Sequence, residues 1–162
     1  MTEFRIATTA DGQLIEEIAA PIWREHYTPI IGSEQVEYML NKFQSESAVI
    51  EQIENGYTYT LVTVDGNYAG YISTEYRDDT LFLSKFYLSA DYRGRGIARD
   101  MLNHVDQLAA EKNCHQIELT VNKYNSAYQI YLKLGFETIE SIVMDIGGGY
   151  VMDDYRMVKK LA

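Results

Sequence analysis

The spacing of apolar residues divides the chain into a helical first third and a strand-rich remainder. Between residues 11 and 55, apolar side chains recur every three or four positions, as on one face of a helix. This pattern predicts a helix opened by Asp11, a second opened by Ser33 and a third over residues 47–55. Pro21 should kink or end the first helix, and residues 27–32 should form a loop.

Runs rich in Tyr, Thr, Val and Leu predict strands in the rest of the chain. The predicted strands, with a short one near the start, are residues 4–7, 57–64, 68–76, 81–88, 116–121, 136–145 and 150–159. Helical spacing returns from Ile97 to Asn113, and a short helix over residues 125–134 should end at Gly135. The length and the absence of repeats or linkers predict one α/β domain over residues 1–162.

A Gly-rich segment, Arg93-Gly94-Arg95-Gly96, joins a predicted buried strand to the helix that begins at Ile97. The first turn of a helix leaves backbone N–H groups free, and no Ser, Thr, Asp or Asn lies between Asp91 and Ile97 to cap them. Glycines let a ligand approach the backbone, while arginines and the helix dipole attract anions. The pattern predicts a polyphosphate site, and a tight turn with solvated arginines is the alternative.

Two common nucleotide-binding motifs do not fit this segment. A P-loop is absent, and the dinucleotide fingerprint requires a small residue where Arg99 stands. What remains is the pattern [Arg/Gln]-x-x-Gly-x-[Gly/Ala], in which the chain resembles the GNAT superfamily of acyl-CoA-dependent N-acetyltransferases. The resemblance implies that this turn binds the pyrophosphate of coenzyme A. The residues of the turn are Arg93, Gly94, Arg95, Gly96, Ile97 and Ala98.

A second motif resembles the N-x-x-A-x-x-x-Y…G-F segment of the same family. It begins at Asn125 and ends at Phe136. The resemblance implies that Asn125 contacts the pantetheine arm and that the hydroxyl of Tyr131 approaches the sulfur, where it is the catalytic donor to the departing thiolate. The alternative is that Tyr124, Tyr128 and Tyr131 form a packing stripe at helical spacing.

The order of predicted elements also matches this family along the full length of the chain. The resemblance implies a single-domain GNAT fold, with a mixed, mostly antiparallel sheet of about seven strands flanked by helices. In the family, a splayed strand before the Gly-rich turn offers backbone N–H groups to the thioester and the pantetheine. That strand corresponds to Phe86, Tyr87 and Leu88.

The general base is not evident from the sequence. Many family members carry Glu in the strand before the turn, but here no acidic residue lies between Asp79 and Asp91. Glu118 and Glu75 are the nearest candidates, and either can equally be a surface strand residue. The base is therefore unassigned. The three histidines lack metal-ligand spacing, so no metal site is expected.

The net charge of −10 disfavours nucleic acid and anionic membranes as partners and favours cationic ones. The single cysteine, Cys114, excludes an internal disulfide framework and fits a reducing compartment. The first residues do not resemble a secretory signal, and no apolar run is long enough to span a membrane. A cytoplasmic location is therefore expected.

The resemblance to the GNAT superfamily implies transfer of an acetyl group from acetyl-CoA to a primary amine, with coenzyme A as product. The acidic charge suggests a small polycationic acceptor such as a polyamine. The aromatic residues Trp23, Tyr27 and Tyr38 and the Gly70-Tyr71 pair resemble the bacterial polyamine acetyltransferase branch. One alternative is a peptide amino-terminal acetyltransferase, which needs an open groove between residues 27–32 and 147–149. Another is a non-catalytic CoA-binding module. The sequence is compatible with a homodimer and does not determine the oligomeric state.

Overall fold

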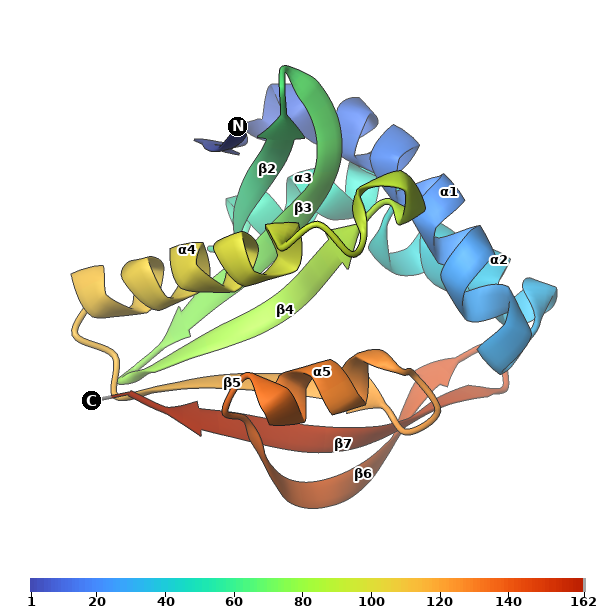
Figure 1. Ribbon diagram of the computed structural model, residues 1–162. Helices are drawn as coiled ribbons and strands as arrows, with labels where there is room; N and C mark the ends of the chain where they lie inside the picture. The colour runs from blue at the N-terminus through green and yellow to red at the C-terminus, as the bar shows by residue number, and fades with distance from the viewer. Residues whose placement is uncertain (162) are drawn as a thin grey trace.

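The computed structural model, which describes residues 1–161, is built around one seven-stranded sheet (Figure 1). The strand order is β1-β2-β3-β4-β5-β7-β6, and every neighbouring pair is antiparallel except β4 and β5. The predicted mixed, mostly antiparallel sheet is confirmed. The strands are β1 (Thr2–Ile6), β2 (Thr58–Val64), β3 (Asn67–Arg77), β4 (Thr80–Leu88), β5 (Gln116–Asn122), β6 (Glu137–Gly147) and β7 (Tyr150–Lys160).

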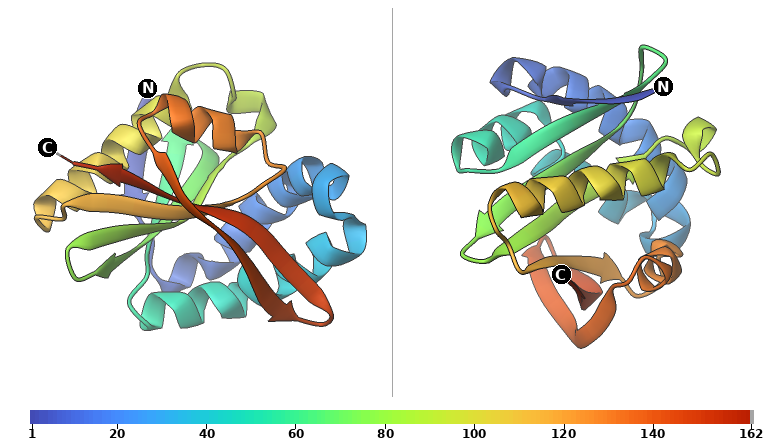
Figure 2. Two further views of the ribbon diagram at one scale, coloured as in Figure 1. Left: turned by 90° about the horizontal axis from the view of Figure 1, so that it is seen from below. Right: turned by 60° about the vertical axis from the view of Figure 1, so that its left-hand side comes forward.

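Helices cover both faces of the sheet (Figure 2). One face packs against α1 (Gly12–Ile31), α2 (Ser33–Phe43) and α3 (Glu46–Glu54), around a core that includes Ile15, Trp23, Val36, Val49 and Leu61. The other face packs against α4 (Ile97–Glu111) and α5 (Ala127–Lys133), around a core that includes Ile72, Leu81, Met101, Val105 and Leu119. Short 3₁₀ helices, η1 (Thr9–Asp11) and η2 (Ala90–Tyr92), precede α1 and α4.

Strands β4 and β5 pair at one end only. Their parallel ladder comprises three residue pairs and ends at Phe82 and Glu118. Beyond this point β4 pairs only with β3, and β5 pairs only with β7. The two strands diverge there (Figure 1), and one backbone edge of each has no partner strand. The sheet therefore consists of two halves that are joined at one end and separated at the other.

Helix α1 continues through both prolines of the chain, Pro21 and Pro29. Of the two outcomes predicted at Pro21, a kink or an end, the helix does not end there. The predicted loop over residues 27–32 is wrong, because the helix ends only at Gly32, where φ is +86°. Each proline removes one helical hydrogen bond. The apolar face of the helix, including the buried Trp23, packs against the sheet, and this tertiary burial outweighs the local cost.

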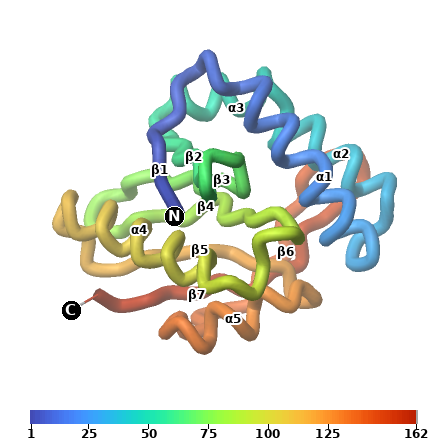
Figure 3. The backbone as a smooth tube through the Cα atoms, turned by 45° about the horizontal axis from the view of Figure 1, so that its top comes forward, coloured from blue at the N-terminus to red at the C-terminus, as the bar shows by residue number. Residues whose placement is uncertain are grey.

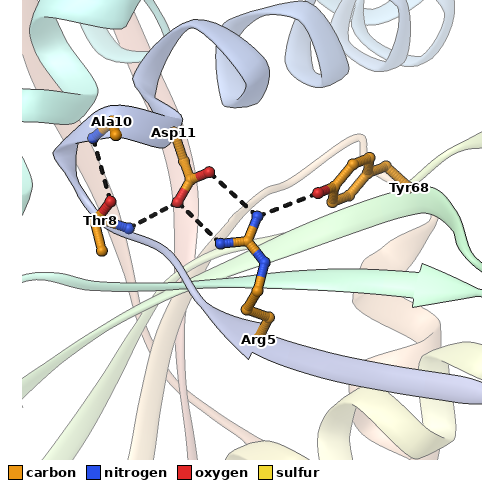
Figure 4. A network of polar contacts seen from close by, with 5 residues as sticks. All are labelled: Arg5, Thr8, Ala10, Asp11 and Tyr68. Atoms are coloured by element: carbon orange, nitrogen blue, oxygen red, sulfur yellow. Dashed lines mark hydrogen bonds and ion pairs between the residues drawn. The ribbon is translucent and has the colours of Figure 1, made fainter.

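An ion-pair network fixes the start of the helical segment to β1 (Figure 4). The Arg5 guanidinium donates to both carboxylate oxygens of Asp11, at 3.1 and 3.2 Å, and to the hydroxyl of Tyr68 at 3.2 Å. Asp11 also accepts from the N–H of Thr8, whose hydroxyl accepts from the N–H of Ala10. This capping box satisfies the first free N–H groups, and Arg5 holds the pKa of the Asp11 carboxyl below its ordinary value.

The remaining predicted elements are confirmed, and their ends shift by two residues at most. The helix expected to run to Asn113 ends at Glu111, because Asn113 adopts a left-handed conformation with φ of +56°. Among residues 1–161, no helix combines the length and the apolar character that crossing a membrane requires.

The close approach of β3 to β4 generates a stability prediction. A Cβ atom on Gly70 would lie 2.1 Å from the carbonyl oxygen of Tyr87. We expect Gly70→Ala to lower the free energy of unfolding by about 3 kcal/mol, because the two strands must separate to accept the methyl group. Gly56→Ala is the control: its φ is +103° with no atom near its Cβ position, so strain alone should cost about 1 kcal/mol. Equal melting temperatures for the two variants would show that the strands separate without cost.

Candidate active site

A continuous cleft crosses the sheet where β4 and β5 diverge. Three adjoining cavities of about 200, 90 and 610 Å³ share Ser84 and Tyr87 of β4 and Thr120 of β5 as lining residues. The first cavity extends towards the start of α4 and towards α5. The large cavity lies between α2 and the β6–β7 hairpin, and the central cavity connects the two. Groups on opposite faces of the sheet can therefore meet near Ser84 and Thr120.

The N-terminal end of α4 presents a row of free backbone donors. Gly94 and Gly96 have φ of +77° and +80°, and Gly96 caps the helix without a side-chain hydrogen bond. Within residues 1–161, no oxygen accepts a hydrogen bond from the N–H groups of residues 94–99. A Cβ on either glycine would meet no atom within 4 Å. Free N–H groups at a helix N-terminus bind anions, so the geometry fits the pyrophosphate site predicted from the sequence.

The three arginines of this segment are engaged differently. Arg93 donates from Nε to the carbonyl oxygen of Leu88, at 3.1 Å, and from Nη1 to both carboxylate oxygens of Glu25, also at 3.1 Å. Arg95 and Arg99 are exposed and form no ion pair within residues 1–161. Arg93 therefore holds the turn against β4 and α1, while Arg95 and Arg99 supply positive charge that is free to meet an anion.

Phe86, Tyr87 and Leu88 form one wall of the first cavity. Each pairs with β3 on one side, and on the other side each faces the gap left by β5. The ring of Phe86 packs edge-on against that of Tyr131, with 6.1 Å between centroids. The structure thus brings the strand edge expected to bind the thioester beside the expected catalytic tyrosine.

Asn125 is buried and joins the start of α5 to α1. Its Oδ1 accepts from the backbone N–H of Ala127 at 2.9 Å and lies 2.8 Å from Nε2 of His26. Its Nδ2 donates to the hydroxyl of Tyr27 at 3.1 Å. The pKa of Tyr27 is raised to about 12, mainly by burial, and the charge of Asp154 contributes to the rise. One N–H of the Asn125 amide remains free of protein partners within residues 1–161 and can serve a ligand.

Tyr131 lines the first cavity and is 7% exposed. Its hydroxyl makes no hydrogen bond within the described part of the chain, and burial raises its pKa above the ordinary value. Tyr131 and Tyr128 both pack against the core of this face, as the alternative of a packing stripe expects, whereas Tyr124 does not. Tyr124 is 75% exposed, and Tyr128 directs its hydroxyl to Thr138 on β6. Tyr131 alone of the three contributes to the cavity wall.

Neither sequence candidate for the general base lines the cleft. Glu118 forms an ion pair with Arg156 at 2.7 Å, and Glu75 forms one with Arg77 at 2.5 Å. The Glu118 pair therefore joins β5 to β7, while the Glu75 pair lies within β3.

Two acidic residues line the cleft, Asp145 of β6 and Asp154 of β7, and neither was a sequence candidate for the base. Asp145 is exposed, and its carboxylate accepts from the N–H of Gly147 at 2.8 Å. Asp154 is the buried one of the two. It is 3% exposed and forms part of the wall of the central cavity. Burial is the main cause that raises the pKa of its carboxyl to about 6. The alternation of side chains along β7 could have predicted that Asp154 faces inward, since it lies two residues after Met152 and shares the face of that residue.

The large cavity is mostly apolar and contains positive charge. Lys85 donates to the carbonyl oxygen of Phe43, the side chain of Gln52 and the hydroxyl of Tyr59, and burial lowers its pKa to about 7. Lys42 donates to a carbonyl oxygen of β6. The aromatic and thioether side chains of the wall are Trp23, Phe43, Tyr57, Phe82, Tyr87, Met39, Met144 and Met152.

Comparison with known proteins shows the family of this chain. A model of the acetyltransferase (GNAT) domain matches residues 27–153. An N-acetyltransferase of Mycobacterium bovis, itself uncharacterised, is 33% identical over 99 residues, which are 60% of this chain and 63% of that protein. Streptothricin acetyltransferase of Streptomyces lavendulae is 25% identical over 138 residues, which are 83% of this chain and 68% of that protein. The PaiA N-acetyltransferase of Thermoplasma acidophilum, solved with coenzyme A, superposes with a TM-score of 0.84 at 22% identity, over 99% of both chains.

The free N–H groups before α4 generate a binding prediction. We expect acetyl-CoA to raise the melting temperature of the protein, since a ligand that binds only the folded state stabilises it. Gly96→Val should abolish this rise by placing a branched side chain beside the free donors. Gly56→Val is the control, because Gly56 also has positive φ but lies far along the chain from the turn. It should lose stability yet keep the rise with acetyl-CoA. A full rise in Gly96→Val would contradict the phosphate site.

Proposed function

The chain belongs to the GNAT acetyltransferase family, whose members use acetyl-CoA, and from this membership we propose that it acetylates the primary amine of a small molecule. The observation that carries the proposal is the cleft through the sheet. Free N–H groups lie at one end of it, and the large aromatic cavity lies at the other. Two reactants that enter from opposite faces are held together at Ser84 and Thr120, which removes much of the entropic cost of their encounter.

We assign the cofactor to the first cavity. The N–H groups of residues 94–99 and the side chain of Arg95 would hold the pyrophosphate. The free edge of residues 86–88 would bind the pantetheine and the thioester carbonyl. The remaining N–H of the Asn125 amide would contact the pantetheine arm. Each assignment uses donors that lack protein partners within residues 1–161.

Tyr131 is the proposed donor to the sulfur. A phenol with pKa near 10 transfers its proton to a thiolate of pKa near 8.5 at a cost of ~2 kcal/mol in water. Burial raises the pKa of Tyr131 further and makes complete transfer less favourable. Its hydroxyl is therefore best suited to donate a hydrogen bond that strengthens as charge develops on the sulfur.

Contacts across the acceptor side support a small molecule rather than a peptide. The hydroxyl of Tyr38 on α2 donates to the carbonyl oxygen of Ile146 on β6, at 2.7 Å. The Gln35 side chain donates to the carbonyl oxygen of Val151 on β7, at 3.0 Å. These bonds hold the β6–β7 hairpin against α2 (Figure 3), where a peptide acetyltransferase would need an open groove.

Two observations bear on the identity of the amine. The net charge of −10 supports a polyamine, because a polycation is attracted to an acidic surface. Asp145 lines the large cavity, but Lys42 and the protonated form of Lys85 would repel a second positive charge there. They favour a second candidate, an amine with one positive charge and an apolar body, for which the aromatic and thioether wall is suited.

The acceptor can be tested by coenzyme A release. We expect spermidine to be acetylated with a higher kcat/KM than peptides with free amino termini, and its KM to rise with added salt, which screens the attraction to the acidic surface. A matched assay with 2-phenylethylamine tests the single-charge candidate. Higher turnover of 2-phenylethylamine without salt dependence would replace the polyamine. Turnover of peptides alone would contradict both.

The role of Tyr131 can be tested by Tyr131→Phe, which removes the hydroxyl and keeps the ring. We expect the single-turnover rate to fall by about 10²-fold, as is typical when a general acid or an oxyanion donor is lost. Stabilisation by acetyl-CoA should remain. Tyr128→Phe is the matched control on the same helix, since its hydroxyl bonds Thr138 outside the cleft. A wild-type single-turnover rate in Tyr131→Phe would reduce Tyr131 to a packing role.

A further inference from the structure

Asp154 is a buried acid without a partner. It lies in the middle of β7, between Asn122 of β5 and Ile142 of β6. Only 3% of the residue is exposed, yet within residues 1–161 its carboxylate accepts no hydrogen bond and forms no ion pair. Burying a carboxylate without compensation is costly, so such groups are rare in protein interiors unless a ligand or function uses them.

The position of Asp154 is the second observation. It lines the central cavity together with Ser84, Tyr87 and Thr120, the residues at which the cleft crosses the sheet. Tyr131 lines the adjoining first cavity, which these same three residues also border. Asp154 and Tyr131 therefore approach the crossing point from opposite sides. That is the arrangement a reaction needs when it removes a proton from one reactant and stabilises charge on the other.

We propose that Asp154 binds the ammonium group of the acceptor and is the general base of acetyl transfer. The proposal rests on the proposed function and adds to it the residue that the sequence leaves unassigned. A carboxylate without a protein partner is free to pair with an incoming cation, and the aromatic wall of the large cavity can hold the rest of the amine.

Two protons leave the ammonium nitrogen during the reaction. One proton of the ammonium passes to the Asp154 carboxylate and frees the nitrogen lone pair, which forms the bond to the acetyl carbon. The bond from that carbon to sulfur breaks, and its electron pair remains on the sulfur. The nitrogen releases its second proton as the amide forms. The sulfur takes up one proton beside Tyr131, so that these two transfers balance. The products are the amide and the thiol, and Asp154 returns its proton to solvent.

The charged and titratable groups near Asp154 determine the pH dependence. Tyr27 of α1 and Tyr87 of β4 line the same cavity, and burial raises the pKa of both hydroxyls, so they stay neutral. The pKa of Asp154 is raised to about 6, mainly by burial; the charge of Asp153 contributes to the rise and Lys123 opposes it. Because the base acts only when deprotonated, kcat/KM should fall as the pH drops below about 6.

The test is Asp154→Asn, which removes the charge and keeps the shape. We expect kcat/KM for the better of spermidine and 2-phenylethylamine to fall by about 10²-fold or more, and the decline below pH 6 to disappear from the profile. Stabilisation by acetyl-CoA should remain. Asp153→Asn is the matched control, because Asp153 forms an ion pair with Lys123 at 2.8 Å and does not line the cleft. It should keep the activity and a decline at low pH, shifted to lower pH because the Asp153 charge that raises the pKa of Asp154 is removed.

Thermal unfolding distinguishes a base from a structural acid. The pKa of Asp154 is higher in the folded chain than in the unfolded chain, so its charge destabilises the fold above about pH 6 and this cost disappears as the pH falls. We therefore expect Asp154→Asn to melt at a higher temperature than wild type at pH 8. A lower melting temperature together with unchanged single-turnover rates would overturn the proposal.

Failure of the proposed function gives a different result. If wild type releases no coenzyme A with any amine, the proposed function fails, and amine binding then decides the role of Asp154. At pH 8, 2-phenylethylamine should raise the melting temperature of wild type and of Asp153→Asn, but not that of Asp154→Asn. Equal effects on all three proteins, or no effect on wild type, would reject Asp154 as the ammonium site.

Discussion

The early end of hydrogen bonding between β4 and β5 is the constraint on which the rest of the site depends. Strands in a sheet normally pair along their length, because buried N–H and C=O groups need partners. Here the ladder ends after three pairs, and the Glu118–Arg156 ion pair lies at its last position. Arg156 also pairs with Glu140 of β6, so β5 stays with β7 and β6 while it departs from β4. The free strand edges and the cleft both follow from this separation.

Side chains from the helical segment bridge the two halves of the sheet. Asn125 connects the β5–α5 segment to His26 and Tyr27 of α1, and Tyr38 connects α2 to the β6–β7 hairpin. The Asn125 bridge lines the first cavity, and the Tyr38 bridge reaches Ile146, which lines the large cavity. They keep the halves at a fixed separation and leave two entrances, one near the start of α4 and one through the large cavity. Cofactor and acceptor can consequently be recognised by different elements of the fold.

The buried polar groups near the cleft fall into two classes. Lys85 is surrounded by three acceptors, so its cost of burial is offset by hydrogen bonds that hold α2, α3 and β2 together. Asp154 and Tyr131 have no such partners within residues 1–161, and both line the cleft. A fold tolerates unpaired polar groups mainly where they serve chemistry, and local rules of stability are most often broken at such sites.

The sequence by itself determined the order and type of nearly every element, the family resemblance, and the positions of Gly96, Asn125 and Tyr131. Local spacing carries this information, because a Gly-rich turn before a helix and an apolar period of three to four residues act over short distances. Only the tertiary structure decided that α1 passes through Pro21 and that Asp154 faces the cleft. Both depend on contacts between segments more than thirty residues apart, and neither packing against a sheet nor the loss of a strand partner leaves a local pattern.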